Sequence, residues 1–257
     1  MARSGTMVDL ATAVTAVTER MLVDAGIREG MRVLDVGCGR GLVSLLIARL
    51  VGERGQVVGV DIDSRALTMA RETVQDSRIT FVEGDFRSLA SEHGQFDAAV
   101  GRRVLMYQPD AVEALRGLAR VLRPGGLMVF QEHDSTVAPT SLTPLPLHAR
   151  VREWMWRTVE REGGNVHMGF GLASALTRAG LTVEHLRAEA IVQTPEMHHY
   201  VGPIARAMLP RILERGVATE VELGIDTLDA RLIEERTKAD ATYIGEMIFC
   251  ASARMPR

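Results

Sequence analysis

Three glycines alternate with other residues directly after a short apolar run, at Gly37, Gly39 and Gly41, and Asp35 lies two residues before the first. Glycines at such a bend let the backbone approach a ligand closely where a strand leads into a helix. A dinucleotide would place its pyrophosphate at this bend, whereas an amino-acid ligand would place its ammonium group near the Asp35 carboxylate. The carboxylate disfavours a pyrophosphate, and Leu42 stands where dinucleotide-binding turns carry a third glycine or an alanine.

Three more short motifs follow the glycine turn in the same half of the chain. They read Gly59-Val60-Asp61-Ile62, Glu83-Gly84-Asp85-Phe86 and Leu122-Arg123-Pro124-Gly125-Gly126. Together with the glycine turn, these motifs resemble the class I S-adenosylmethionine-dependent methyltransferases, in that family's order, over residues 31–134. The resemblance rests on all four motifs, because a glycine turn alone also occurs in other nucleotide-binding proteins.

The resemblance implies S-adenosyl-L-methionine as cofactor and S-adenosyl-L-homocysteine as its product. It implies that Asp61 accepts hydrogen bonds from the ribose hydroxyls and that Ile62 packs on one face of the adenine. Asp85 would accept from the adenine amine, although an acid after a strand is also good turn chemistry without a ligand. The cofactor-binding residues that the resemblance implies are Asp35, Gly37, Cys38, Gly39, Asp61, Ile62, Gly84, Asp85, Phe86, Gly101 and Arg102.

Residues outside these motifs must bind the methyl acceptor. Methyl transfer is an in-line displacement, so the protein mainly aligns a nucleophile with the methyl carbon and excludes water. His133 follows the fifth predicted strand and could take a proton near neutral pH, or it could be held by Asp134 or Glu132 in a polar turn. We predict His133 as the catalytic residue. The predicted acceptor contacts are Tyr107, Trp154, His167 and Tyr200.

Alternating strand-like and helix-like segments must position these motifs. Helices separated by apolar strands favour parallel pairing with right-handed crossovers and helices on both faces. The prediction is an α/β fold, a doubly wound, mostly parallel seven-stranded Rossmann-like sheet with an antiparallel last strand and a helical cap inserted before it. The first half predicts strands over 32–36, 56–60, 79–83, 96–100 and 127–131, helices over 8–25, 42–50, 64–75 and 110–121, and a turn over 123–126.

The second half predicts an acceptor-side region. Two helices, over 147–162 and 171–179, precede strands over 182–192 and 243–253, and a mostly helical stretch separates those strands. A connection that long favours a functional lid. We expect one domain over 1–257, with an N-terminal helix in 1–26, a cofactor-binding core in 27–134 and cap segments in 135–170 and 195–240.

Composition narrows the function classes. The 257 residues carry 30 cationic and 33 anionic side chains, a net charge of −3, which argues against a basic nucleic-acid-binding face. Two cysteines exclude a disulfide framework, and no stretch predicts a signal peptide or a membrane-spanning helix. The adjacent His198 and His199 lack further ligands at a recognisable spacing, so we predict no metal site. We expect a cytoplasmic protein with a small-molecule acceptor and no nucleic-acid or membrane partner; a homodimer stays open.

Three functions compete. The leading one is methylation of an O, N or C atom of a small, partly apolar metabolite. The second is a protein that binds the cofactor without transferring a methyl group. The third, a nicotinamide-dependent oxidoreductase, is disfavoured by Leu42 and by the Pro-Gly-Gly turn before the fifth strand.

Overall fold

The computed structural model describes residues 8–88, 95–197 and 200–256, and helices and strands alternate along most of that length. In chain order the elements are α1 (Val8–Asp24), β1 (Arg32–Val36), α2 (Leu42–Val51), β2 (Gln56–Asp61), α3 (Ser64–Thr73), β3 (Ile79–Glu83), η1 (Phe86–Ser88), β4 (Phe96–Arg102), η3 (Leu105–Tyr107), α4 (Ala111–Ala119), β5 (Leu122–His133), α5 (Pro146–Arg161), α6 (Met168–Arg178), β6 (Thr182–Gln193), α7 (Val201–Glu214), α8 (Glu220–Leu223), α9 (Ile225–Ala239) and β7 (Tyr243–Arg254).

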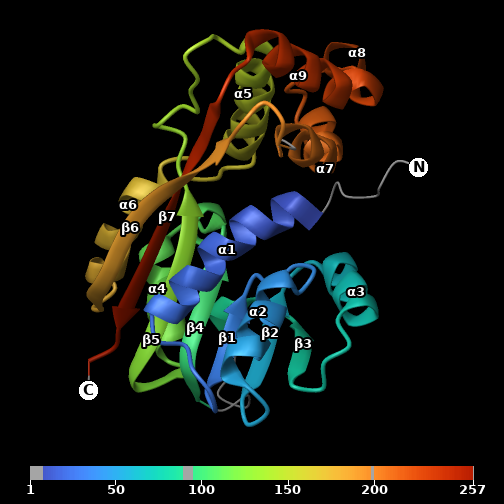
Figure 1. The fold of residues 1–257 in the computed structure, drawn as a ribbon. Coiled ribbons are helices and arrows are strands. Elements are labelled where there is room, and N and C mark those ends of the chain that lie inside the picture. The colour runs from blue at the N-terminus through green and yellow to red at the C-terminus, as the bar shows by residue number, and fades with distance from the viewer. Residues whose placement is uncertain (1–7, 89–94, 198–199, 257) are drawn as a thin grey trace. The chain divides into compact units, whose positions relative to one another are not determined.

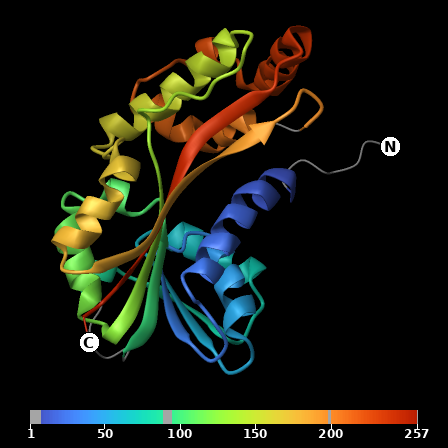
Figure 2. The same cartoon turned by 60° about the vertical axis from the view of Figure 1, so that its left-hand side comes forward.

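The described strands form one seven-stranded sheet in the order β3-β2-β1-β4-β5-β7-β6 (Figure 1). Strands β1 to β5 pair in parallel, and β7 pairs antiparallel with β5, beside which it runs in Figure 2. The predicted fold class, including the antiparallel last strand, is therefore confirmed. The strand order reverses between β1 and β4, and such a reversal opens a crevice at the carboxyl ends of the strands.

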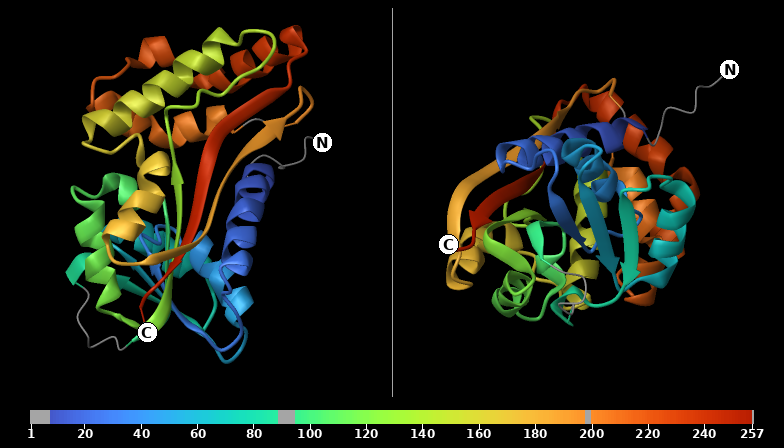
Figure 3. Two further views of the ribbon diagram at one scale, coloured as in Figure 1. Left: turned by 90° about the vertical axis from the view of Figure 1, so that its left-hand side faces the viewer. Right: turned by 90° about the horizontal axis from the view of Figure 1, so that it is seen from below.

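The chain folds into two compact units. Unit two comprises residues 17–133, 168–188 and 248–257 and holds β1 to β5. Its helices cover both faces of the sheet, with α2 on one face and α4 and α6 on the other (Figure 3). Burial on both faces explains the apolar strands: Val33, Leu34 and Val36 of β1 are fully buried, each contributing about 1.5–3 kcal/mol.

Strand β5 corrects one prediction. Residues 123–126 were expected to form a turn before a strand, but they lie inside β5. Phe96 of β4 pairs with Leu122 and Ala98 pairs with Leu127, so two steps along β4 match five along β5. The three extra residues (5 − 2) bulge out of the ladder, and Gly125 takes the positive φ of 74° that this bend requires.

Unit one comprises residues 1–16, 134–167 and 189–247. Helices α5, α7 and α9 pack against one another in it (Figure 1). The Trp156 indole of α5 donates to Glu246 of β7 at 2.5 Å, and the Glu246 amide donates to the Tyr200 hydroxyl at 3.3 Å. Most of the two predicted cap segments, 135–170 and 195–240, belongs to this unit.

Among residues 8–88, 95–197 and 200–256, no helix is long and apolar enough to cross a lipid bilayer.

Candidate functional site

A cavity of about 480 Å³ lies in unit two at the carboxyl ends of β1, β2 and β4, where the strand order reverses. Ligands of open α/β sheets bind at this place, and the volume lies within the usual range for small-molecule sites. Of the residues predicted from the sequence, seven line it: Gly37, Asp61, Ile62, Gly84, Asp85, Phe86 and Tyr107. The remaining lining residues are Val60, Arg87, Arg103, Val104, Gln108 and Pro109.

The glycine turn needs its glycines for backbone reasons. Gly37, Gly39 and Gly41 have φ values of 62°, 52° and 79°, in the left-handed region that side chains disfavour. A Cβ on Gly37 would lie 2.7 Å from a methyl group of Val104, and one on Gly41 would lie 2.7 Å from the Phe81 ring. Among the residues that the structure describes, none outside its chain neighbours has an atom within 4 Å of a Cβ on Gly39, so open space lies beside this residue.

Asp61, at the end of β2, ties the turn to the cavity. Its Oδ2 accepts the Gly39 amide at 2.7 Å, and its Oδ1 accepts the Asp63 amide at 2.9 Å. A carboxylate has about four lone-pair sites, so these two bonds leave two for a ligand. Asp61 therefore fixes the turn and still has the capacity to accept two hydroxyl groups.

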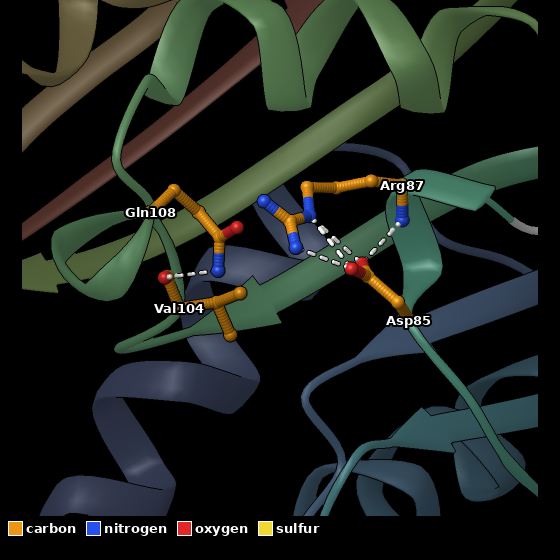
Figure 4. Close-up of polar contacts among 4 residues, drawn as sticks. All are labelled: Asp85, Arg87, Val104 and Gln108. Carbon is orange, nitrogen blue, oxygen red and sulfur yellow. Dashed lines mark hydrogen bonds and ion pairs between the residues drawn. The ribbon is translucent and has the colours of Figure 1, made fainter.

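Asp85 is occupied in a different way. Arg87 donates to this carboxylate through its backbone amide at 2.9 Å, through Nε at 2.8 and 2.9 Å, and through Nη2 (Figure 4). The hydrogen bonds from Arg87 lower the pKa of Asp85 below its usual value. The Arg87 side chain is half exposed, so its release would cost little. Asp85 can accept from an adenine amine only after Arg87 moves.

A buried group lies next to the turn, in β1. Asp35 is 1% exposed, and its Oδ2 accepts the Ser44 hydroxyl at 2.5 Å. Burial raises the pKa of Asp35 to about 7, which the Ser44 bond and the charge of Arg102 partly oppose. Burial likewise lowers the pKa of Arg102, while the charge of Asp35 raises it. Asp35 and Arg102 do not line the cavity.

Two further predicted residues serve packing. Cys38 is 6% exposed and burial raises its pKa, so its thiol is a small filler rather than a nucleophile. A Cβ on Gly101 would lie 2.4 Å from the Phe130 ring, so this glycine lets β4 and β5 pack closely. Neither residue is among those that line the cavity.

A turn that the sequence did not single out forms one wall. The Arg103 amide donates to the Gln131 carbonyl at 2.8 Å, and the amides of Val104 and Leu105 donate to the buried Glu132 carboxyl at 3.0 and 2.8 Å. Burial raises the pKa of Glu132 to about 7. Two features of the sequence could have indicated this turn. Glu132 is an acidic residue at the end of one apolar strand, and Arg103 is a cationic residue after a second apolar strand.

The predicted catalytic and acceptor residues are dispersed. His133 is the last residue of β5 and is half-buried. Because side chains alternate along a strand, His133 lies on the same face of the sheet as Gln131, and Glu132 lies on the opposite face. The Gln131 amide oxygen accepts a hydrogen bond from the Thr18 hydroxyl. Tyr107 belongs to η3 and is 36% exposed in the cavity wall.

Three predicted acceptor contacts lie in unit one. Trp154 is half-buried on α5, and the exposed His167 lies 3.0 Å from the Thr136 hydroxyl. Tyr200 is buried, and a Cβ on Gly245 would lie 1.9 Å from its hydroxyl oxygen.

Among the described residues no group of three or more His, Cys, Asp or Glu side chains could hold a metal ion. His198 and His199 lie outside the described residues.

Comparison with known proteins supplies an independent assignment. The methyltransferase domain family matches residues 27–176. Demethylmenaquinone methyltransferase of Staphylococcus aureus (strain MRSA252) is 34% identical over 122 residues, which are 47% of this chain and 51% of that protein. The chain thus spans about half the length of the curated relatives it matches.

Solved structures agree on the fold. A Bacillus halodurans protein described as a methyltransferase superposes with a TM-score of 0.62 at 17% identity, covering 94% of this chain and 100% of the other. Phosphoethanolamine N-methyltransferase 2 of Haemonchus contortus, solved with S-adenosyl-L-methionine, gives a TM-score of 0.59 at 20% identity, covering 94% and 53%. At such identities the likeness establishes the Rossmann-like fold.

Proposed function

The chain belongs to the methyltransferase domain family, and from this premise we propose that it transfers a methyl group from S-adenosylmethionine to a small-molecule acceptor. The observation that carries the proposal is Asp61: a strand-end carboxylate with two lone-pair sites left, lining a cavity beside the glycine turn that it braces. The acceptor atom is O, N or C of a partly apolar metabolite.

The cavity residues fit a nucleoside. Asp61 offers acceptor sites for ribose hydroxyls, while Ile62, which is 76% exposed, and the buried Phe86 offer apolar surface for a base. Apart from its chain neighbours, no described residue has an atom within 4 Å of a Cβ built on Gly84, so a ring has room beside it. When bound, S-adenosylmethionine supplies an activated methyl group on a sulfonium.

The chain's own residues then bind the cofactor, orient the acceptor and exclude water. Asp61 holds the glycine turn and the ligand hydroxyls, and Glu132 holds the turn that carries Tyr107 through two backbone amides. Tyr107 contacts the acceptor from the cavity wall. His133, at the carboxyl end of β5, takes the acceptor proton where the acceptor has one to lose.

Trp154, His167 and Tyr200 remain proposed acceptor contacts in unit one. A contact of this kind predicts that its alanine variant raises KM for the acceptor and leaves cofactor affinity unchanged. Tyr200 has in addition a structural bond to Glu246, so Tyr200→Phe, which keeps the ring, is its matched variant.

The deciding experiment incubates the purified protein with methyl-labelled S-adenosylmethionine and a panel of phenols, amines and quinols. We expect label to move to at least one acceptor, with stoichiometric S-adenosylhomocysteine detected by mass spectrometry. A protein that binds S-adenosylhomocysteine but transfers label to no acceptor would instead be the non-transferring binding protein. A protein that binds neither nucleoside would refute the proposal altogether.

A further inference from the structure

Arg103 adopts a backbone conformation that its residue type disfavours. Its φ is +58°, and among the described non-glycine residues only Asp240 shares a positive φ. A Cβ clashes with the neighbouring carbonyl in this region, so the surrounding structure must impose the conformation. Gln131 and Glu132 impose it here, because they bind the amides of Arg103 and of the two residues that follow.

The Arg103 side chain adds a second cost. Its Nε is buried and has no hydrogen-bond partner among the described residues, although Arg103 lines the cavity. The other arginine in the wall, Arg87, is paired with Asp85. Glu132 is buried nearby, and the charge of Arg103 partly opposes the rise that burial causes in the pKa of Glu132, but Glu132 Oε2 likewise has no hydrogen-bond partner among the described residues. A buried donor without a partner is unfavourable.

The strained backbone is understandable if a ligand completes the site, because it holds the Arg103 side chain in the cavity wall. Strained non-glycine residues cluster where a binding geometry has to be preorganised, and a guanidinium matches a carboxylate with two parallel hydrogen bonds. We propose that Arg103 binds a carboxylate on the methyl acceptor, so that the acceptors of this protein are carboxylic acids. The proposal rests on the proposed function, because it assigns the acceptor of the same cavity.

A carboxylate could also come from the amino-acid part of S-adenosylmethionine itself. The two sources separate experimentally, because removal of Arg103 weakens either the acceptor or the nucleoside. The matched probes are 3,4-dihydroxybenzoate and its neutral amide, 3,4-dihydroxybenzamide, titrated calorimetrically into the full chain with and without S-adenosylhomocysteine. The two probes have nearly the same shape and differ in charge.

We expect the wild-type protein to bind the acid about tenfold or more tightly than the amide, the scale of charge-assisted hydrogen bonds. Arg103→Met, which keeps the length of the side chain, removes this preference and leaves S-adenosylhomocysteine affinity unchanged. Arg103→Lys keeps the charge but not the paired geometry and retains part of the preference. Arg120→Met, at the exposed end of α4, controls for loss of a positive charge elsewhere.

Three outcomes overturn the proposal: equal affinity of the wild-type protein for acid and amide, a preference that survives Arg103→Met, or loss of S-adenosylhomocysteine affinity in that variant. The last would assign the carboxylate to the nucleoside. Failure of the wild-type protein to bind S-adenosylhomocysteine would refute the proposed function instead, while the titrations without nucleoside still decide whether Arg103 selects acids.

Thermal unfolding supplies a readout that needs no ligand. Arg103→Gly removes both the strained side chain and the buried Nε, so its melting temperature should exceed that of the wild-type protein. Arg103→Met keeps the strain and removes only the buried Nε, so its gain should be smaller. A melting temperature of Arg103→Gly below that of Arg103→Met would contradict the argument that the site stores strain for a ligand.

Discussion

Replacing Glu132 by glutamine should stabilise the protein at alkaline pH and leave its stability almost unchanged at acid pH. The Glu132 side chain is fully buried, and its Oε1 accepts the amides of Val104 and Leu105, while its Oε2 has no partner within the described part of the chain. A glutamine carbonyl can accept the same two amides. The substitution therefore keeps the turn and removes the buried charge, and its amide nitrogen takes the place that the protonated oxygen holds in the neutral acid.

The magnitude follows from the pKa of Glu132, which burial raises from 4.5 to about 7. Between these values the folded state binds more protons than the unfolded state, so the free energy of unfolding falls as pH rises through the window. At ~1.36 kcal/mol per pH unit the full loss is about 3 kcal/mol. The glutamine variant lacks this loss, so it should exceed the wild-type protein by about 1–3 kcal/mol at pH ~8 and match it at pH ~5.

Urea denaturation of both proteins at the two pH values measures the difference. Asp35 also has a raised pKa, but it titrates in both proteins, so its contribution cancels in the difference between their free energies of unfolding. Glu132→Ala is the control: it leaves two buried amides without an acceptor and should be less stable than the glutamine variant at both pH values. A stability difference between wild type and Glu132→Gln that is the same at both pH values would refute the reasoning.

Three further variants test the site. His133→Ala should lower turnover by ~10²–10⁴ with S-adenosylhomocysteine affinity nearly intact if His133 is the base; preserved turnover would remove that role. Arg87→Ala frees the Asp85 carboxylate and should strengthen S-adenosylhomocysteine binding by up to about fivefold, the value of an exposed ion pair; weaker binding in calorimetry would show that Arg87 itself holds the ligand. Ser44→Ala removes the donor to Asp35 and should cost ~1–3 kcal/mol of unfolding free energy, more at alkaline than at acid pH because the bond favours the charged carboxylate; an equal cost in urea denaturation at both pH values would count against it.

The sheet was predictable because its strands are local apolar runs. The spans predicted for β1 and β3 agree with the structure, and β2 and β4 were each predicted with the right start and run slightly longer. The bulge in β5 was not predictable, since it depends on pairing with a distant part of the chain. Arg254 donates to the Gly125 carbonyl at 3.0 Å, and the Met255 amide donates to the Gly126 carbonyl at 2.9 Å.

Part of the candidate site was likewise predictable from the sequence and part was not. Glycines and acidic residues at strand ends can be recognised from their spacing in the sequence. Asp61, which was recognised in this way, lies in the cavity wall. The partners of these residues do not show in the sequence. Nothing in the local pattern says that Arg87 occupies Asp85, or that Glu132 captures two amides of a turn 27 and 28 positions earlier. The Glu132 contacts arise from tertiary packing, whereas the Arg87 contact joins residues two positions apart and depends on the side-chain conformation within the turn.

Calorimetric titration of S-adenosylhomocysteine into wild type, Asp61→Ala and Asp63→Ala tests most directly whether this cavity is the nucleoside site. Asp63 caps α3 two residues away and does not line the cavity, so its variant controls for loss of a nearby carboxylate. We predict one-site binding in wild type and Asp63→Ala, and a loss of ~1.5–3 kcal/mol of binding free energy in Asp61→Ala. Absence of binding heat in the wild-type protein, or equal affinity in all three proteins, would contradict the assignment of this cavity as the nucleoside site.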